Sequence, residues 1–335
     1  MASRKAGFPQ INISPFEDYI AGKKAILPEL KDVEQLSPRV IRILGQNPGK
    51  MTMQGTNTYI VGTGPKRLII DTGQGMPAWA DLVSSTLAMS SASLSHVLLT
   101  HWHGDHVGGV PDLVRRYPHL LQGESGGGDG GPMIYKHSPR DLQQEQPIAD
   151  GQVFCVEGAT IRAVHSPGHS HDHMCFVLEE EGAMFTGDNV LGHGTGFYEH
   201  LGTWMATLRA MRAHDCRVGY PAHGVVIADL PSKIAGELAQ KERRERHVLQ
   251  TLLGQTSRRK NGKGGGLTVG ELVVEMHGSA LAGSQTTATT THESESALVP
   301  FFEETLRKLA EDGKVGFGVR RGQKSWFALE TTIIT

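Results

Sequence analysis

Short apolar runs that end at glycine alternate with amphipathic stretches through the first 230 residues of the chain. NTYIVGTG at 57–64 and KRLIIDTG at 66–73 are rich in β-branched residues and stop at glycine, which predicts two strands. Apolar residues recur at helical spacing in AWADLVSSTLAM at 78–89, which predicts a helix. SHVLLT at 95–100 then has the pattern of a short buried strand.

Residues 152–227 have a mostly strand-like pattern that one helix interrupts. The predicted strands are bounded by turns and read VFCVEG (153–158), ATIRAVHSPG (159–168), MCFVLEE (174–180), GAMFTGD (182–188) and RVGYPAHG (217–224). The predicted helix is TWMATLRAMRAH at 203–214. Because strands and helices alternate through both halves of this region, we expect an α/β fold in which helices cover sheets.

The pattern changes after Leu230, where helices and charged residues dominate. PSKIAGELAQKERRERHVLQTLLG at 231–254 predicts a long charged helix with supporting ion pairs between successive turns. The remaining elements expected here are two helices, at 267–278 and 297–313, followed by strands at 315–319 and 325–330 that join around Gly322. Helices followed by a β-hairpin predict a winged-helix-like extension.

We therefore divide the chain into an N-terminal lead-in at 1–37, a main domain at 38–230 and a C-terminal extension at 231–335. The polar lead-in contains one helix-like stretch, FEDYIAGKKAIL at 16–27. Low-complexity segments lie outside the predicted helices and strands, at 123–132, 257–266 and 279–294.

Composition narrows the class of protein. The chain has 335 residues, of which 38% are hydrophobic, and its mean hydropathy is -0.27. No run approaches the roughly 20 apolar residues of a membrane-spanning helix, and the N-terminus lacks the apolar core of a secretion signal. The three cysteines, Cys155, Cys175 and Cys216, are too few for a disulfide framework and are expected to be buried apolar residues. We therefore expect a cytoplasmic protein without a membrane partner.

The net charge does not indicate a binding partner, whereas the histidine content does. The net charge of -2 gives the whole chain no general attraction to nucleic acid. The 17 histidines are an unusual number and point to metal binding. Four potential ligands lie close together in THWHGDHVGG at 100–109, namely His101, His103, Asp105 and His106. Histidine nitrogen and carboxylate oxygen are typical ligands of zinc, and a catalytic zinc site keeps one position open for water.

His101 and His103 can bind one ion, and Asp105 and His106 can turn toward a second. This segment alone supplies too few ligands for two ions, so we expect further ligands at other strand ends. Three residues each follow a predicted strand: His169 in SPGHSHDH, Asp188 in MFTGDN and His223 in YPAHG. Three neighbours of His169, namely His165, His171 and His173, are candidates for supporting or lining the site. The other histidines are expected to have no chemical role; they are His96, His119, His137, His193, His200, His214, His247, His277 and His292.

The motifs HWHGDH, PGH, TGD and AHG, in this order and each after a predicted strand, resemble the metallo-β-lactamase superfamily over roughly residues 38–230. The resemblance implies an αββα sandwich with a metal site along one sheet edge. It also implies two zinc ions, one held by His101, His103 and His169, the other by Asp105, His106 and His223, with Asp188 bridging both. Asp71 in LIIDTG matches the family's first motif, in which the carboxylate supports a ligand without binding the metal.

This ligand set predicts a hydrolase. Two zinc ions about 3.5–4 Å apart can share a hydroxide that attacks an electrophile near neutral pH. The expected reaction is therefore hydrolysis of an activated carbonyl or of a phosphodiester. Asp105 is the expected catalytic residue, because besides binding zinc it can orient the hydroxide and move its proton.

Two groups of the superfamily resemble the chain at 36–64 and in SPGHSHDHMCF at 166–176. One comprises fungal thioesterases that release products from non-reducing polyketide synthases, such as the atrochrysone carboxyl ACP thioesterases. The other comprises lactamase-like endoribonucleases of mitochondria. The lead-in and the glycine- and serine-rich insertions resemble the fungal thioesterases more closely.

Thioester hydrolysis and RNA cleavage also differ in the groups that each reaction requires. A thioester leaves as a thiolate of modest basicity, so a zinc-bound hydroxide suffices without a strong general acid. RNA cleavage requires a basic track, and the candidate is 241–263, with eight Lys or Arg residues and two Glu. The same run could dock an acidic acyl carrier protein. We expect zinc-dependent release of a polyketide acid from the acyl carrier domain of a polyketide synthase; the alternative is cleavage of single-stranded RNA.

Overall fold

The computed structural model describes residues 27–116, 133–139, 145–260, 266–282, 288–320 and 322–329. The chain separates into two compact units, one spanning Ile26–Leu238 and the other built from Ala239–Thr335. The division falls within helix α6 (Leu230–Lys260). Within the described ranges, no helix is both long enough and apolar enough to cross a membrane.

The first unit contains two sheets. Within the described residues the larger sheet follows chain order: β1 (Val33–Ser37), β2 (Val40–Leu44), β3 (Asn57–Val61), β4 (Lys66–Ile70), β5 (Ser93–Leu98), β6 (Met133–Lys136) and β7 (Glu145–Pro147). Strands β1 to β4 pair antiparallel, and β4 to β7 pair parallel. Every residue of β2 and β3 is buried, which fits strands whose two faces are both covered.

The second sheet has the order β12-β11-β10-β9-β8. Its strands are β8 (Val153–Val156), β9 (Ala159–His165), β10 (Met174–Leu178), β11 (Ala183–Gly187) and β12 (Val218–Pro221). Strand β10 runs antiparallel to both β9 and β11, and β12 runs parallel to β11. Strands β9, β11 and β12 therefore point the same way, and their carboxyl ends lie at one edge.

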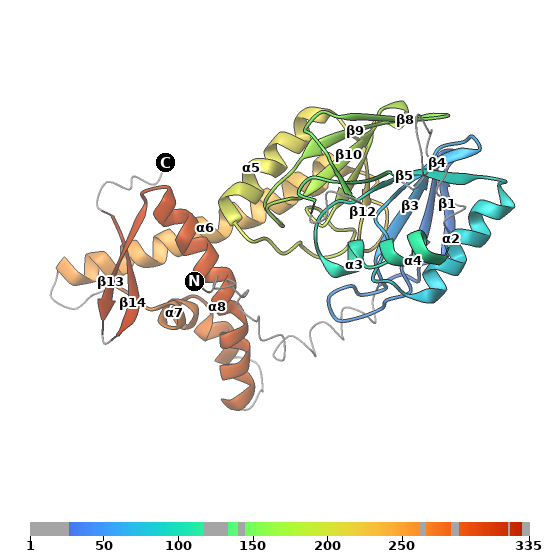
Figure 1. Cartoon of the computed structure of the whole chain (residues 1–335). Coiled ribbons are helices and arrows are strands. Elements are labelled where there is room, and N and C mark those ends of the chain that lie inside the picture. Colours follow the sequence, from blue (N-terminus) through green and yellow to red (C-terminus); the bar gives the residue numbers. More distant parts are fainter. Residues whose placement is uncertain are drawn as a thin grey trace, which may run out of the picture. The chain divides into compact units, whose positions relative to one another are not determined.

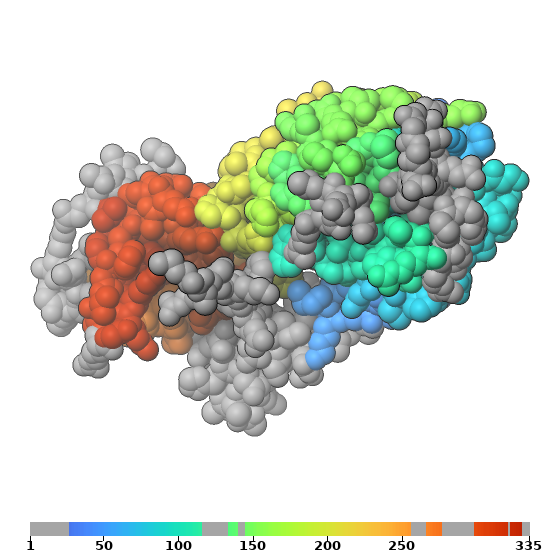
Figure 2. Space-filling model, viewed as in Figure 1, coloured from blue at the N-terminus to red at the C-terminus, as the bar shows by residue number. Residues whose placement is uncertain are grey.

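Helices cover the outer faces of both sheets. Leu68 and Ile70 pack into the core between the sheets, while Ile69 faces α2 (Pro77–Met89), because alternate strand residues point to opposite faces. Helix α4 (Val110–Arg116) packs on the same outer face as α2, and α5 (Leu201–Met211) covers the second sheet. Figure 1 shows these four layers, and Figure 2 shows early (blue) and middle (green) parts of the chain sharing one surface. The predicted αββα sandwich is confirmed.

The second unit is built from helices and a hairpin. Beside the rest of α6, its elements are α7 (Val269–Ala282), α8 (Ala288–Glu311), β13 (Val315–Arg320) and β14 (Gln323–Ala328). Phe302, Leu306 and Leu309 of α8 pack with Trp326 of β14 in its core. Gly313 follows α8 with a φ of 69°, a left-handed conformation that suits a C-terminal glycine cap. The expected helices and hairpin are present, and the winged-helix likeness stays a prediction.

Some elements lie where the sequence pattern did not indicate them. Strand β1 falls inside the segment 1–37 that we read as a lead-in, and the short strands β6 and β7 were not predicted. Helix α6 continues to Lys260 and α8 begins at Ala288, inside the two C-terminal low-complexity segments, because helix elongation is easier than its nucleation. Cys155 is exposed on the edge strand β8, contrary to the expected burial. The segments 16–26 and 123–132 lie outside the described residues.

Candidate metal centre

The candidate ligands follow strands whose carboxyl ends meet at one edge of the sandwich. His101 and His103 follow β5, Asp105 and His106 lie in the short helix α3 (Gly104–Val107), and His169, Asp188 and His223 follow β9, β11 and β12. These side chains form two groups, and in each group the ligand atoms lie within 4.8 Å of one another. His101, His103, His169 and Asp188 form the first group, and Asp105, His106 and His223 form the second.

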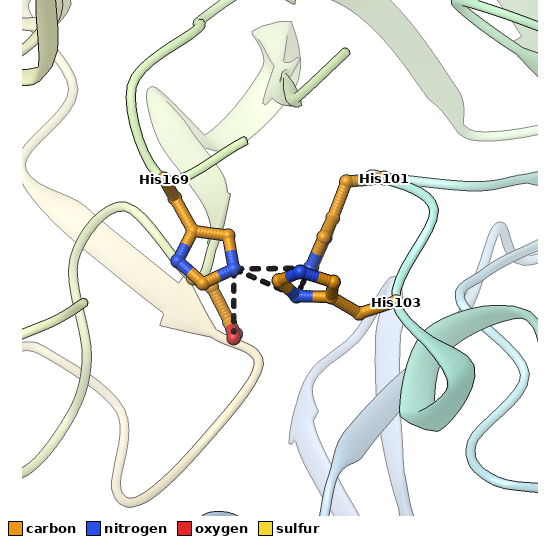
Figure 3. Close-up of side chains that lie close together, drawn as sticks. His101, His103 and His169 are labelled. Atoms are coloured by element: carbon orange, nitrogen blue, oxygen red, sulfur yellow. Dashed lines mark hydrogen bonds and ion pairs between the residues drawn. The ribbon is translucent and has the colours of Figure 1, made fainter. Parts of the chain in front are cut away.

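The first group contains three imidazole rings that point toward one another (Figure 3). Nε2 of His101 lies 2.9 Å from Nδ1 of His103. Nε2 of His169 lies 3.2 Å from Nε2 of His101 and 3.0 Å from Nδ1 of His103. Nδ1 of His169 donates to the carbonyl oxygen of Phe197 at 2.8 Å, so the lone pair of its Nε2 faces the other two rings.

The second group is held around the carboxylate of Asp105. Oδ2 of Asp105 lies 3.3 Å from Nε2 of His106 and 3.3 Å from Nε2 of His223. Asp188 lies between the two groups, with one oxygen toward each. Its Oδ1 is 3.3 Å from Nε2 of His223, and its Oδ2 is 3.5 Å from Nε2 of His169.

Two observations show that this donor set fits a metal ion. Nε2 of His106 and Oδ1 of Asp188 are buried without a hydrogen-bond partner among the described residues, which is rare for buried polar atoms. The nitrogen separations in the first group are also close to the roughly 3.3 Å expected between ligands of a tetrahedral zinc ion, whose Zn–N bonds are about 2.0–2.1 Å. The cluster therefore has the donors and the spacing that a metal-binding site needs.

Asp71 orients one ring of the second group. Its Oδ2 accepts a hydrogen bond of 2.8 Å from Nδ1 of His106, which leaves Nε2 of that ring for the site. Its Oδ1 accepts from the backbone N–H of Thr100 at 2.8 Å, and the Thr100 hydroxyl also donates to the carboxylate. Asp71 has a φ of 59°, an uncommon left-handed backbone that Asp tolerates better than most residues. This strained turn aims the carboxylate at His106.

Two supporting residues escaped the sequence analysis. Thr56 donates from Oγ1 to Oδ2 of Asp105 at 3.1 Å. Asn57, one residue later, donates from Nδ2 to the carbonyl oxygens of Pro221 and Gly224, on either side of His223. Asn57 begins the run read only as a strand and Thr56 directly precedes it, and each bridges a long sequence separation. Periodicity predicted their strand but not their partners.

The three histidines near His169 have different roles. His173 is fully buried, and its Nε2 accepts from the backbone N–H of Asp188 at 3.1 Å. A side chain at Gly187 would approach this ring to 2.4 Å, so the glycine permits the close contact. His165 stacks on His137 and His171 contacts Glu199, so neither belongs to the two groups of candidate ligands.

The histidine rings of the two groups differ in the direction of their pKa shifts. Burial and the neighbouring His169 lower the pKa of His103 to about 4, so this ring is neutral at pH 7. Burial also opposes charge on His223, but Asp188 and Asp105 outweigh it and raise its pKa to about 9. The pKa of His106 is likewise raised, because the nearby carboxylates outweigh the effect of burial. Without metal, the second group therefore carries protons that a bound ion would have to displace.

The sequence profile of the metallo-β-lactamase superfamily matches residues 51–223, more than half of the 335-residue chain. The chain belongs to the metallo-β-lactamase superfamily. Its candidate metal ligands lie together at strand ends of both sheets, which is the arrangement that its motifs implied.

Curated relatives of this metallo-β-lactamase superfamily member match nearly its whole length. It is 61% identical to the atrochrysone carboxyl ACP thioesterase dmxR1 of Cryptosporiopsis sp., with 99% of this chain and 100% of that protein covered. It is 61% identical to an atrochrysone carboxyl ACP thioesterase of Aspergillus terreus, with 97% of each covered. It is 62% identical to the lactamase-like protein ptaB of Pestalotiopsis fici, with 97% and 98% covered.

Solved structures share the fold of this superfamily member. A β-lactamase domain protein from Burkholderia ambifaria matches with a TM-score of 0.66 at 15% identity, over 90% of this chain and 95% of that chain. A metallo-β-lactamase family protein from Thermus thermophilus matches with a TM-score of 0.59 at 20% identity, over 88% and 100%. At these identities the likeness concerns the fold alone.

Proposed function

We propose that this protein is a thioesterase that hydrolyses the thioester between a polyketide and the acyl carrier domain of a polyketide synthase. The observation that carries the proposal is an identity of 61% over at least 97% of the chain to two proteins named atrochrysone carboxyl ACP thioesterase. The products are a free polyketide acid and the carrier thiol. The partner is the acyl carrier domain.

The proposed cofactor is a pair of zinc ions. The first ion would be held by His101, His103 and His169, the second by Asp105, His106 and His223, and Asp188 would be shared. When bound, the ions would activate a water molecule for attack and stabilise negative charge on the carbonyl oxygen of the thioester. The two unpartnered buried atoms and the converging imidazole nitrogens support this assignment.

Asp105 is the proposed catalytic residue. Burial would raise its pKa, but the charges of the nearby His106 and His223 rings hold it far below its usual value, so the group is a carboxylate. Its side chain is 22% exposed, whereas that of His106 is fully buried, so attacking water can reach Asp105. The hydroxyl of Thr56 fixes one carboxylate oxygen. Asp105 can therefore orient the water and accept its proton.

A thioester suits these groups better than a phosphodiester does. Thiols are much more acidic than alcohols, with a pKa of about 8.5 for cysteine, so the carrier sulfur can leave as a thiolate without a strong general acid. A nuclease would also need a basic track to bind the RNA backbone. In the described part of 241–263, Glu245 forms an ion pair with Lys308 and Arg244 lies over the ring of Phe301, so part of this run packs against α8.

The test compares two substrates with zinc-loaded protein. One arm measures release of acid from a polyketide thioester on a carrier protein, and the other measures cleavage of labelled single-stranded RNA. We expect thioester hydrolysis that is lost in His103→Ala and Asp105→Asn, with circular dichroism unchanged and RNA intact. RNA cleavage with an inert thioester would replace the proposal with the nuclease alternative. Full thioester turnover in both variants would refute the metal mechanism.

A further inference from the structure

His193 lies in the loop between β11 and α5, which is held firmly near the metal centre. Residues 191–196 read LGHGTG, and glycines flank His193 on both sides. The loop is fastened to α6 by two hydrogen bonds, from Nζ of Lys233 to the carbonyl oxygen of Gly194 (2.7 Å) and from Oγ1 of Thr195 to Oε2 of Glu237 (2.6 Å). These two bonds hold the residues that directly follow His193.

The loop places the imidazole ring of His193 against the turn that carries His223. The N–H of Gly192 donates to the carbonyl oxygen of His223 at 2.9 Å. A side chain at Gly224 would come within 2.7 Å of Cδ2 of His193, so the ring lies directly on this turn. Gly224 also has a φ of 87°, which favours glycine there.

One nitrogen of this ring lacks a partner. Nε2 of His193 is buried, yet no group among the described residues hydrogen-bonds to it. The ring does bond to the backbone of His193 itself, and this bond favours the protonated ring, so the ring is its donor. Since Nε2 is unpartnered, the donor is Nδ1, and Nε2 carries a lone pair in the neutral ring. His193 is not in either group of candidate metal ligands.

A neutral imidazole whose Nδ1 donates has one acceptor, the lone pair of Nε2. In His193 this acceptor is buried and has no partner among the described residues. Buried acceptors without partners are rare, which indicates that a donor from outside the chain binds here.

We infer that Nε2 of His193 accepts a hydrogen bond from the amide N–H of the pantetheine arm that carries the acyl thioester, an inference that rests on the proposed function. In this arm an amide N–H follows the sulfur after a two-carbon linker. When the sulfur lies at the metal centre, this N–H is the nearest donor on the leaving side of the substrate. His193 is thus a substrate-binding residue that recognises the carrier arm, independent of the acyl chain.

Thiol binding to the cobalt-loaded protein tests the inference without turnover. The probes are N-acetylcysteamine, which has the amide N–H, and 2-acetoxyethanethiol, in which an ester oxygen replaces it. Thiolate-to-cobalt absorption reports the affinity of each thiol. We expect the wild-type protein to prefer the amide by about three- to tenfold, the usual worth of one hydrogen bond. His193→Ala should lose this preference, and His193→Gln, which keeps an acceptor near the position of Nε2, should retain most of it.

Other outcomes overturn the assignment. Equal affinities for the two thiols in the wild-type protein, or an undiminished preference in His193→Ala, would mean that Nε2 bonds water instead. An absence of the absorption band with both thiols would mean that the sulfur does not reach the metal. Metal content and circular dichroism of both variants should match the wild-type protein. Hydrolysis of the carrier thioester reports on the proposed function separately, so its success together with equal thiol affinities would refute the role of His193 alone.

Discussion

The carboxylate of Asp71 accepts a hydrogen bond of 2.8 Å from Nδ1 of His106, and this contact decides which nitrogen of His106 faces the metal centre. The two residues are 35 positions apart, and both are almost fully buried. A histidine ligand held in this way keeps its ring orientation and its basicity. The same relationship gives the first testable prediction.

Asp71→Asn should weaken metal binding at the second group by about 10- to 100-fold, the usual effect of losing such a supporting contact. Asn tolerates the left-handed backbone at this position, where φ is 59°, so the fold should survive. Metal affinity can be measured by competition with a chelator, and circular dichroism checks the fold. Unchanged affinity of both metal equivalents would show that the orientation of His106 does not depend on Asp71.

Thr56→Val should lower the turnover number for thioester hydrolysis by about tenfold, because it removes the hydroxyl that bonds to Asp105 at 3.1 Å. Thr56→Ser keeps the hydroxyl and is the matched control. Steady-state kinetics of both variants, with zinc content determined, measures the effect. Equal losses in the two variants would assign the effect to packing around this fully buried residue rather than to the hydrogen bond.

Metal binding at the second group should weaken as the pH falls. The raised pKa of His223, about 9, means that the metal-free ring is protonated at pH 7 and must release its proton to bind. Affinity should therefore fall at least about tenfold per pH unit below pH 9. His103, whose pKa is lowered to about 4, is already neutral, so it adds no such dependence to the first group. Calorimetric titrations between pH 6.5 and 8.5 would contradict this if both metal equivalents showed the same slope.

Gly168→Ala should destabilise the first unit by about 3 kcal/mol or more, since it combines backbone strain with a clash. Gly168 has a φ of 139°, and an added Cβ would lie 2.4 Å from the backbone Cα of Trp204 in α5. Gly182→Ala is the control, because Gly182 has a φ of 53° but open space around it. Its cost should be about 1–2 kcal/mol. Urea unfolding measures both, and equal values would exclude a rigid contact with α5.

Leu306→Ala should destabilise the second unit by about 2–5 kcal/mol, as for other fully buried leucines. Val319→Ala, at a side chain that is 75% exposed, should have little effect. Hydrogen exchange read by mass spectrometry should show faster exchange across α8 and the β13–β14 hairpin in the leucine variant. Unaltered exchange there would mean that the cluster around Phe302 and Trp326 does not support this unit.

Local pattern in the sequence was enough to predict much of the fold and to nominate the candidate ligands. Strands such as β3 and β11 have β-branched or apolar runs that end at glycine, and α5 has helical periodicity, so neighbouring residues carry their signals. The candidate ligands lie at or just after strand ends, and each short motif by itself indicates a potential metal ligand. The resemblance of these motifs, in this order, to the metallo-β-lactamase superfamily implied that the ligands converge at one sheet edge.

Tertiary structure alone decided the contacts that hold these groups in place. Thr56 reaches Asp105 across 49 positions, and His173 supports Asp188 across 15, which depends on how the strands pair. The short strands β6 and β7 join the sheet through parallel pairing with a distant neighbour, so their own three or four residues carry little signal. His193 looked like any other histidine until folding placed its ring on the turn at His223 and left Nε2 buried without a partner among the described residues. Residue type and spacing are local properties that a sequence records, whereas pairing, burial and ring orientation arise only when distant segments pack together.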